Sequence, residues 1–124
     1  MTKILLVEDE TRALRVMHRA LTRRGYEVQT ATDADAAIQV GQTFAPHVLL
    51  ADWSLGGAHD GIYVAETLRA LDPDLAIVLF SGLAIDALQT AAAHLPRCVF
   101  LQKPFGLHTL ETSLQRALQN VNRA

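Results

Sequence analysis

Five polar side chains follow short apolar segments of this sequence and have the types needed to hold a cation and an anion. In chain order they are Glu8, Asp9, Asp52, Ser81 and Lys103. Two carboxylates about 4 Å apart repel each other by about 4 kcal/mol at an effective dielectric constant of about 20. One lysine compensates only part of the charge of three carboxylates, so a divalent cation is the natural partner. A ligand set of oxygen atoms alone favours Mg²⁺ or Mn²⁺ over zinc.

The segments that must position these side chains alternate between strand and helix patterns. Mainly apolar runs of strand length cover residues 4–7, 47–51, 75–80 and 98–102, and residues 26–30 form a weaker strand pattern. Helical patterns cover 11–24, about 34–42 behind the candidate caps Thr32 and Asp33, about 62–71, 85–94 and 110–121. Runs that are apolar throughout are typical of strands buried on both faces of a parallel sheet.

Five strand–helix units in a row predict an α/β fold. Right-handed crossovers would connect a parallel sheet that carries helices on both faces. The carboxyl ends of all strands in such a sheet lie at one edge, and ligands bind at that edge. Since each of the five polar side chains follows a predicted strand, we expect them to converge there although they are distant in sequence.

The composition predicts one domain and excludes several classes of protein. The 124 residues are half apolar and carry a net charge of −2, which gives no general attraction to nucleic acid or to an anionic membrane. Cys98 is the only cysteine, so an internal disulfide framework and a cysteine-based zinc site are excluded. No apolar run reaches the ~18–20 residues that span a bilayer, and the amino terminus carries no secretory signal. We therefore expect a cytoplasmic protein.

Four short motifs together resemble the receiver domain of bacterial two-component response regulators. They are Val-Glu-Asp after the first strand, Leu-Leu-Ala-Asp in the third, Phe-Ser-Gly after the fourth and Phe-Leu-Gln-Lys-Pro-Phe at the fifth. The resemblance covers essentially the whole chain. It implies a flavodoxin-like receiver domain over residues 2–124 with no output domain. Its five-stranded parallel sheet would have the strand order 2-1-3-4-5 and be flanked by five helices.

The resemblance also implies a role for each site residue. Asp52 resembles the phosphoacceptor, which takes a phosphoryl group from a sensor histidine kinase or a histidine phosphotransfer protein. Lys103 and Ser81 would each contact a phosphoryl oxygen. Ser81 is also a switch residue, and Phe100 matches the aromatic switch position. For Mg²⁺, the implied ligands are Asp9, Asp52 and the backbone carbonyl of Ser54, with Glu8 acting through water.

Some residues depart from the family pattern. Glu8 stands where aspartate is commoner, and Ser81 replaces the frequent threonine but keeps the hydroxyl. The loop after Asp52 is one residue longer than usual and has Gly56-Gly57 in place of a proline, which predicts a more mobile loop. Ser54 and Leu83 occupy positions thought to tune hydrolysis of the acyl phosphate. Because Leu83 cannot orient a water molecule, we expect a long-lived phosphorylated form.

The main interpretation is a phosphorylation-dependent signalling switch that assists its own phosphorylation and dephosphorylation and is not a turnover enzyme. The alternative that stays open is a phosphorylation-independent binding module with the receiver fold. A haloacid-dehalogenase-type phosphatase would need Asp-x-Asp after the first strand, and a flavodoxin-like carrier of FMN would need a phosphate loop there. The chain has Glu8-Asp9-Glu10-Thr11 instead.

The partners expected from the sequence are proteins. A downstream protein target is expected, without direct contact to nucleic acid or a membrane, and a homodimer is possible. Four arginines recur at helical spacing, at positions 12, 15, 19 and 23. They form either a docking face for an acidic partner, since kinases contact this helix in the family, or an ordinary solvated face. The cognate kinase, the stimulus and the target are not encoded in any motif.

Overall fold

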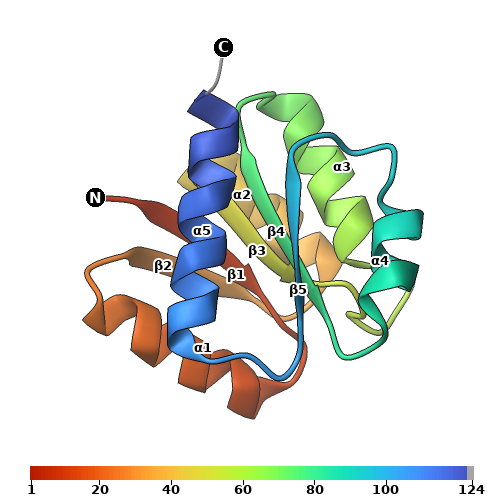
Figure 1. Ribbon diagram of the computed structural model, residues 1–124. Coiled ribbons are helices and arrows are strands. Elements are labelled where there is room, and N and C mark those ends of the chain that lie inside the picture. Colours follow the sequence, from red (N-terminus) through yellow and green to blue (C-terminus); the bar gives the residue numbers. More distant parts are fainter. Residues whose placement is uncertain (123–124) are drawn as a thin grey trace.

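The computed structural model describes residues 1–122 as a parallel sheet covered by helices on both faces (Figure 1). Residues 123 and 124, the last two of the predicted domain, lie outside the described part. Within it the strands are β1 (Lys3–Val7), β2 (Glu27–Ala31), β3 (Val48–Asp52), β4 (Ala76–Ser81) and β5 (Cys98–Gln102). The helices are α1 (Thr11–Arg23), α2 (Ala34–Phe44), α3 (Gly61–Leu71), α4 (Ile85–Ala91) and α5 (Leu107–Asn122).

The strands lie in the order β2-β1-β3-β4-β5, and all four pairings are parallel. This confirms the predicted fold class and strand order. Every residue of β3 and β4 is buried, as continuous apolar runs require in a sheet covered on both sides. The edge strand β2 instead alternates between exposed and more buried positions.

The two faces of the sheet have separate hydrophobic cores. Helices α1 and α5 cover one face, where Leu21 and Leu114 pack against Ile4, Leu6 and Phe80. Helices α2, α3 and α4 cover the other face, which carries the alternate residues of the same strands. Side chains on successive strand residues point to opposite faces, so each apolar run supplies both cores.

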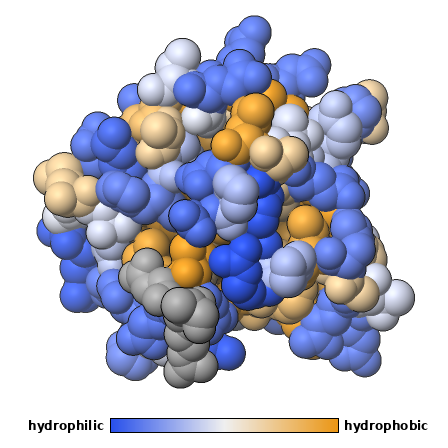
Figure 2. Space-filling view, turned by 90° about the horizontal axis from the view of Figure 1, so that it is seen from above, coloured by the Kyte–Doolittle hydropathy of each residue, from blue (hydrophilic) through white to orange (hydrophobic). Residues whose placement is uncertain are grey.

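The strand register aligns the carboxyl ends of the central strands. Val7 pairs with Ala51, Asp52 with Phe80, and Ser81 with Gln102. The residues that follow these pairs therefore gather at one end of the sheet, which is the lower end in Figure 1. Figure 2 shows the opposite end, covered mainly by hydrophilic residues with scattered hydrophobic ones.

Most predicted boundaries differ from the observed ones by at most two residues, but the start of α5 and the end of α4 were predicted wrongly, each by three residues. The helix predicted over 85–94 ends at Ala91, and the segment up to Pro96 consists of turns. After Ala91 the chain changes to turns, in which the N–H groups of Ala93 and Leu95 donate to the carbonyls three residues earlier, those of Thr90 and Ala92, at 3.3 and 3.0 Å. In addition, no side chain caps the start of α4. Among the described residues, no helix is both long enough and apolar enough to cross a membrane.

Candidate functional site

Three carboxylates lie together at the carboxyl end of the sheet. Each of Glu8, Asp9 and Asp52 offers an oxygen atom, and these oxygens all lie within 4.8 Å of one another. Glu8 is fully buried and Asp52 is 5% exposed, whereas Asp9 faces solvent. The ends of β1 and β3 position the group, since these strands are direct neighbours in the sheet.

Lys103 binds two of these carboxylates from the end of β5. Its Nζ donates to Glu8 Oε1 at 2.8 Å and to Asp52 Oδ2 at 2.7 Å. The same ammonium lies 5.1 Å from the centre of the Phe80 ring, at a distance that allows a cation–π interaction. Phe80 in turn contacts Phe105 edge to face, with the ring centroids 5.6 Å apart. The ammonium of Lys103 therefore contacts the Phe80 ring and two carboxylates.

The burial of these charges changes their proton affinities. Burial raises the pKa of Glu8 to about 7, since its hydrogen bond from Lys103 only partly offsets the loss of water and the neighbouring charge of Asp52 raises the pKa further. Burial by itself lowers the pKa of Lys103, but its bonds to Asp52 and Glu8 outweigh that effect and hold the pKa above its usual value. Lys103 is therefore charged at neutral pH, while Glu8 holds a proton more tightly than an ordinary glutamate does.

The donor atoms of this site suit a hard divalent cation. Glu8 Oε2 is buried and has no hydrogen-bond partner among the described residues. Leaving a buried acceptor unpaired costs about 1–3 kcal/mol, more for a charged group. One ammonium faces three carboxylates, so negative charge remains in excess. An all-oxygen set with excess negative charge and one unpaired oxygen fits Mg²⁺.

The other predicted site residues lie around this cluster. Ser54 donates its backbone N–H to Asp52 Oδ1 at 3.1 Å. Ser81 is buried at the end of β4, and its Oγ accepts a hydrogen bond from the N–H of Leu83 at 2.9 Å. The Ser81 hydroxyl is thus engaged by its own loop and makes no hydrogen bond to the carboxylates. Phe100 is half-buried and packs against the core beneath α2, α3 and α4.

The loop between β3 and α3 is closed at both ends beside Asp52. Gly61 N donates to Trp53 O at 2.9 Å, and Trp53 Nε1 donates to Asp60 Oδ2 at 3.2 Å. A Cβ at Gly61 would lie 2.1 Å from the carbonyl oxygen of Asp52, so only glycine fits there. The first turn of α3 is therefore fixed against the strand that carries Asp52.

Sequence reasoning missed Phe80 and Asp60 as parts of the site. Asp60 also caps α3 through the N–H of Tyr63, at 2.9 Å. An aspartate directly before a helix is a recognisable cap signal, so Asp60 could have been found. Phe80 gave no signal, because it reads as one more apolar residue of a buried strand.

The match to a known family extends over most of the chain. The family model "Response regulator receiver domain" matches residues 4–115. The response regulator receiver protein CpdR of Brucella abortus is 31% identical over 118 residues, which cover 95% of this chain and 98% of CpdR. The sensor kinase CckA of the same organism is 32% identical over 120 residues, which cover 94% of this chain and 12% of CckA.

A solved structure gives the same result. The response regulator receiver protein from Sinorhizobium medicae is 30% identical and superposes with a TM-score of 0.87, covering 98% of this chain and 97% of that one. Other curated relatives are longer proteins, and the chain spans between 26% and 60% of their length. The matching segment, the fold and the sheet topology agree, and the chain therefore belongs to the response regulator receiver domain family.

Proposed function

We propose that this receiver domain is a phosphorylation-dependent switch of a two-component system or phosphorelay, with Asp52 as the phosphoacceptor. The observation that carries the proposal is the environment of Asp52. The Asp52 side chain is 8% exposed, and its carboxylate is bound by Lys103 Nζ and adjoins Glu8 and Asp9. The similarity to a segment of a sensor kinase supports a sensor histidine kinase or a histidine phosphotransfer protein as the donor.

In the proposed transfer, a carboxylate oxygen of Asp52 attacks the phosphorus of a phosphohistidine. The new O–P bond forms as the N–P bond breaks, and the leaving imidazole nitrogen keeps the electron pair and takes a proton from solvent. Lys103 holds one carboxylate oxygen at 2.7 Å and then pairs with a phosphoryl oxygen. Catalysis of this kind depends mainly on positioning and electrostatics.

Mg²⁺ is the cation we propose for the acidic cluster. Asp9, Asp52 and the carbonyl of Ser54 would hold it directly, and Glu8 would hold it through water. When bound, the cation offsets negative charge on the transferring phosphoryl group. The unpaired Oε2 of Glu8 and the excess of carboxylates over ammonium groups support this assignment.

Ser81 and Phe100 carry the proposed conformational switch. Ser81 would exchange its bond from the Leu83 N–H for one to a phosphoryl oxygen, and Phe100 would move with it. Charge-assisted hydrogen bonds contribute about 1.5–3 kcal/mol each, so those from Ser81 and Lys103 supply about 3–6 kcal/mol. Converting a population from 1:99 to 99:1 needs about 5.5 kcal/mol. The contacts are therefore of the right size for a switch.

The remaining parts of the proposal concern context. Residues 2–124 form the receiver domain, in a cytoplasmic protein that signals through a downstream protein. The apolar side chain of Leu83 is 62% exposed and offers no group to orient a water molecule, which supports a long-lived acyl phosphate. A half-life of a few seconds for phosphate release in vitro would contradict that part.

Acetyl phosphate with Mg²⁺ tests the central proposal without a protein donor. We expect the mass of one phosphoryl group to be added and the fluorescence of Trp53 to change. Trp53 reports on the site because it follows the phosphoacceptor and bonds to Asp60. If neither the mass nor the fluorescence changes, the phosphorylation-independent binding module is the better interpretation.

A further inference from the structure

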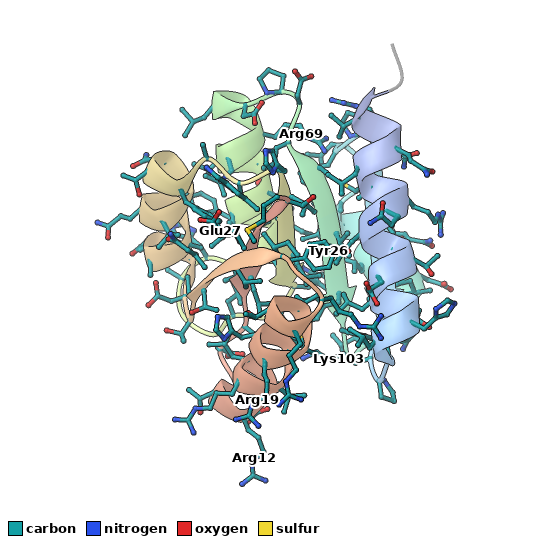
Figure 3. All side chains as sticks on the ribbon, turned by 90° about the vertical axis from the view of Figure 1, so that its left-hand side faces the viewer. Arg12, Arg19, Tyr26, Glu27, Arg69 and Lys103 are labelled. Atoms are coloured by element: carbon teal, nitrogen blue, oxygen red, sulfur yellow. The ribbon has the colours of Figure 1, made fainter. Side chains whose placement is uncertain are left out.

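The ring of Phe80 lies against the ammonium group that binds the carboxylates of the site. Phe80 is fully buried on β4, and Lys103 Nζ lies over its ring, 5.1 Å from the centre. Figure 3 shows Lys103 at the end of the sheet where α5 begins. A cation over the face of an aromatic ring is attracted by the negative charge of that face, more strongly where water is excluded. The Phe80 ring therefore acts on the charge of Lys103 as well as filling space in the core.

The sheet places Phe80 between the strand that carries Asp52 and the strand that leads to Lys103. On one side Phe80 pairs in register with Asp52, and its carbonyl accepts a hydrogen bond from the N–H of Trp53 at 2.8 Å. On the other side the carbonyl of Ser81, the next residue, accepts one from the N–H of Lys103 at 2.8 Å. Backbone hydrogen bonds therefore fix the origin of the ring relative to the lysine and to the aspartate.

Neighbouring side chains hold the Phe80 ring in one orientation. Phe105 meets it edge to face, with the ring centroids 5.6 Å apart and the ring planes at 70°. Phe80 also lies in the same hydrophobic core as Ile4 and Leu6, which are both fully buried. Close packing of this kind keeps a core side chain in one rotamer. The face of the ring therefore stays turned to the ammonium.

The contact with the ring differs from the other two contacts of Lys103 because the reaction does not change it. The side chain of Lys103 is 32% exposed, and a lysine side chain is a flexible four-carbon stem with rotating donors. Its bond to Asp52, at 2.7 Å, passes to a phosphoryl oxygen in the proposed transfer. The Phe80 ring carries no exchangeable group and stays in the core throughout. It can therefore hold Nζ in place while one acceptor replaces another.

We propose that Phe80 is a positioning residue for phosphoryl transfer to Asp52, and that it acts by holding the ammonium of Lys103 over its ring. This inference rests on the proposed function. It adds that an aromatic face, and not the carboxylates alone, places the lysine before the phosphoryl group arrives. The rate of transfer should accordingly depend on the negative charge of the ring face and not only on the size of the side chain.

Fluorinated phenylalanines at position 80 test the charge of the ring at almost constant size. One, two or three fluorine atoms on the ring, introduced at this position alone, withdraw electrons stepwise and weaken its attraction for a cation. The second-order rate constant for labelling by acetyl phosphate with Mg²⁺, followed by intact-protein mass, should fall with each fluorine. Three fluorines should leave at most about a third of the wild-type rate constant. An unchanged rate constant across the series would overturn the proposal.

Phe44 offers a matched control in the same chain. Its ring is 7% exposed and lies 5.4 Å from the ammonium of Lys3, so it makes the same kind of contact with a lysine. Lys3 begins β1, at the opposite end of the sheet from Lys103. Three fluorines at position 44 should leave the rate of labelling unchanged. An equal loss at both positions would show that fluorination acts on the domain in general, which would overturn the proposal.

Removing the ammonium separates positioning from packing. The trifluorinated ring at position 80 should lower the urea midpoint of unfolding by at least about 0.3 M more in the wild-type background than in Lys103→Met. An equal shift in the two backgrounds would show that the ring only fills the core, and the proposal would be wrong. Failure of the unmodified domain to take label from acetyl phosphate would instead contradict the proposed function.

Discussion

The acidic cluster, formed by Glu8, Asp9 and Asp52, and the exposed arginines of α1 at positions 12, 15, 19 and 23 are both concentrations of like charge, but they lie in different surroundings. In the acidic cluster, Glu8 and Asp52 are buried, and burial raises the pKa of Glu8 to about 7 although Lys103 binds both carboxylates. On α1 the arginines are exposed to water, which screens them from one another. Burial therefore makes each charge in the cluster matter for stability and chemistry, whereas exposure leaves the arginines available to a partner.

The largest expected effect concerns the centre of the acidic cluster. Asp52→Asn should remove labelling by acetyl phosphate almost completely, at least about a hundredfold, because the amide lacks the nucleophilic carboxylate. Asp74→Asn, at an exposed position before β4, should be labelled like the wild type. Intact-protein mass spectrometry measures both. If Asp52→Asn is labelled nearly as strongly as the wild type, another residue is the phosphoacceptor.

Removing the ammonium of Lys103 should show how strongly the stability of the buried acidic cluster depends on that charge. Lys103→Met leaves two buried carboxylates without their cation, which should lower the free energy of unfolding by about 3 kcal/mol at pH 8. Lys3, the only other lysine, bonds to the carbonyl of Phe44 away from the site, and Lys3→Met should cost less than about 1 kcal/mol. Urea unfolding without Mg²⁺ compares the two variants. Equal losses of unfolding free energy would contradict the role of Lys103 in compensating the buried carboxylates.

The raised pKa of Glu8 predicts an unusual pH dependence. Because the folded-state pKa lies above the unfolded value of 4.5, Glu8 contributes stability that is complete below pH 4.5 and is lost as the pH rises through about 7. Without Mg²⁺, this contribution should fall by up to about 3 kcal/mol between pH 4.5 and pH 8.

Glu8→Gln should abolish that part of the slope, since its side chain does not titrate. Glu27→Gln, at an exposed position on β2, should keep it. Urea unfolding at several pH values measures the difference between each variant and the wild type. If the difference in free energy of unfolding between the wild type and Glu8→Gln does not change with pH, Glu8 has an ordinary pKa.

The smallest expected effect concerns the exposed arginines of α1. Salt should stabilise the wild-type domain by about 0.5 kcal/mol through screening of the repulsion between arginines on α1. Arg19→Glu should remove this gain, while Arg116→Glu should retain it. Thermal unfolding at low and high NaCl checks the expectation, and an effect as large as that of Lys103→Met would contradict the contrast between buried and exposed charge.

Much of the fold was predictable because periodicity and burial act locally. Four apolar runs and the weaker pattern over residues 26–30 predicted the strands within one residue, and Asp33 is the cap of α2, as expected for one of two candidates. The end of α4 was missed because the alanine-rich sequence favours a helix up to His94, whereas the backbone after Ala91 forms turns closed by the N–H groups of Ala93 and Leu95. The strand order came from family resemblance and not from periodicity.

The acidic cluster was predictable in position but not in detail. Strand ends in a parallel sheet meet at one edge, so the proximity of Glu8, Asp52 and Lys103 follows from topology. The bond from Leu83 to Ser81 and the Phe80 ring beneath Lys103 depend on how side chains and a loop settle after the sheet has formed. No spacing in the sequence encodes those contacts.

Because the loop between Trp53 and Gly61 is closed by hydrogen bonds at its base, the position of Asp52 should not depend on the length of the loop. Both ends of the loop are tied to each other and to the strand, so we expect residues added after Gly57, where a Cβ would meet no atom within 4 Å, to leave Asp52 in place. Such a place suits the engineering of sensors: a fluorescent or peptide graft inserted there would sit beside the reacting carboxylate while the scaffold stays intact.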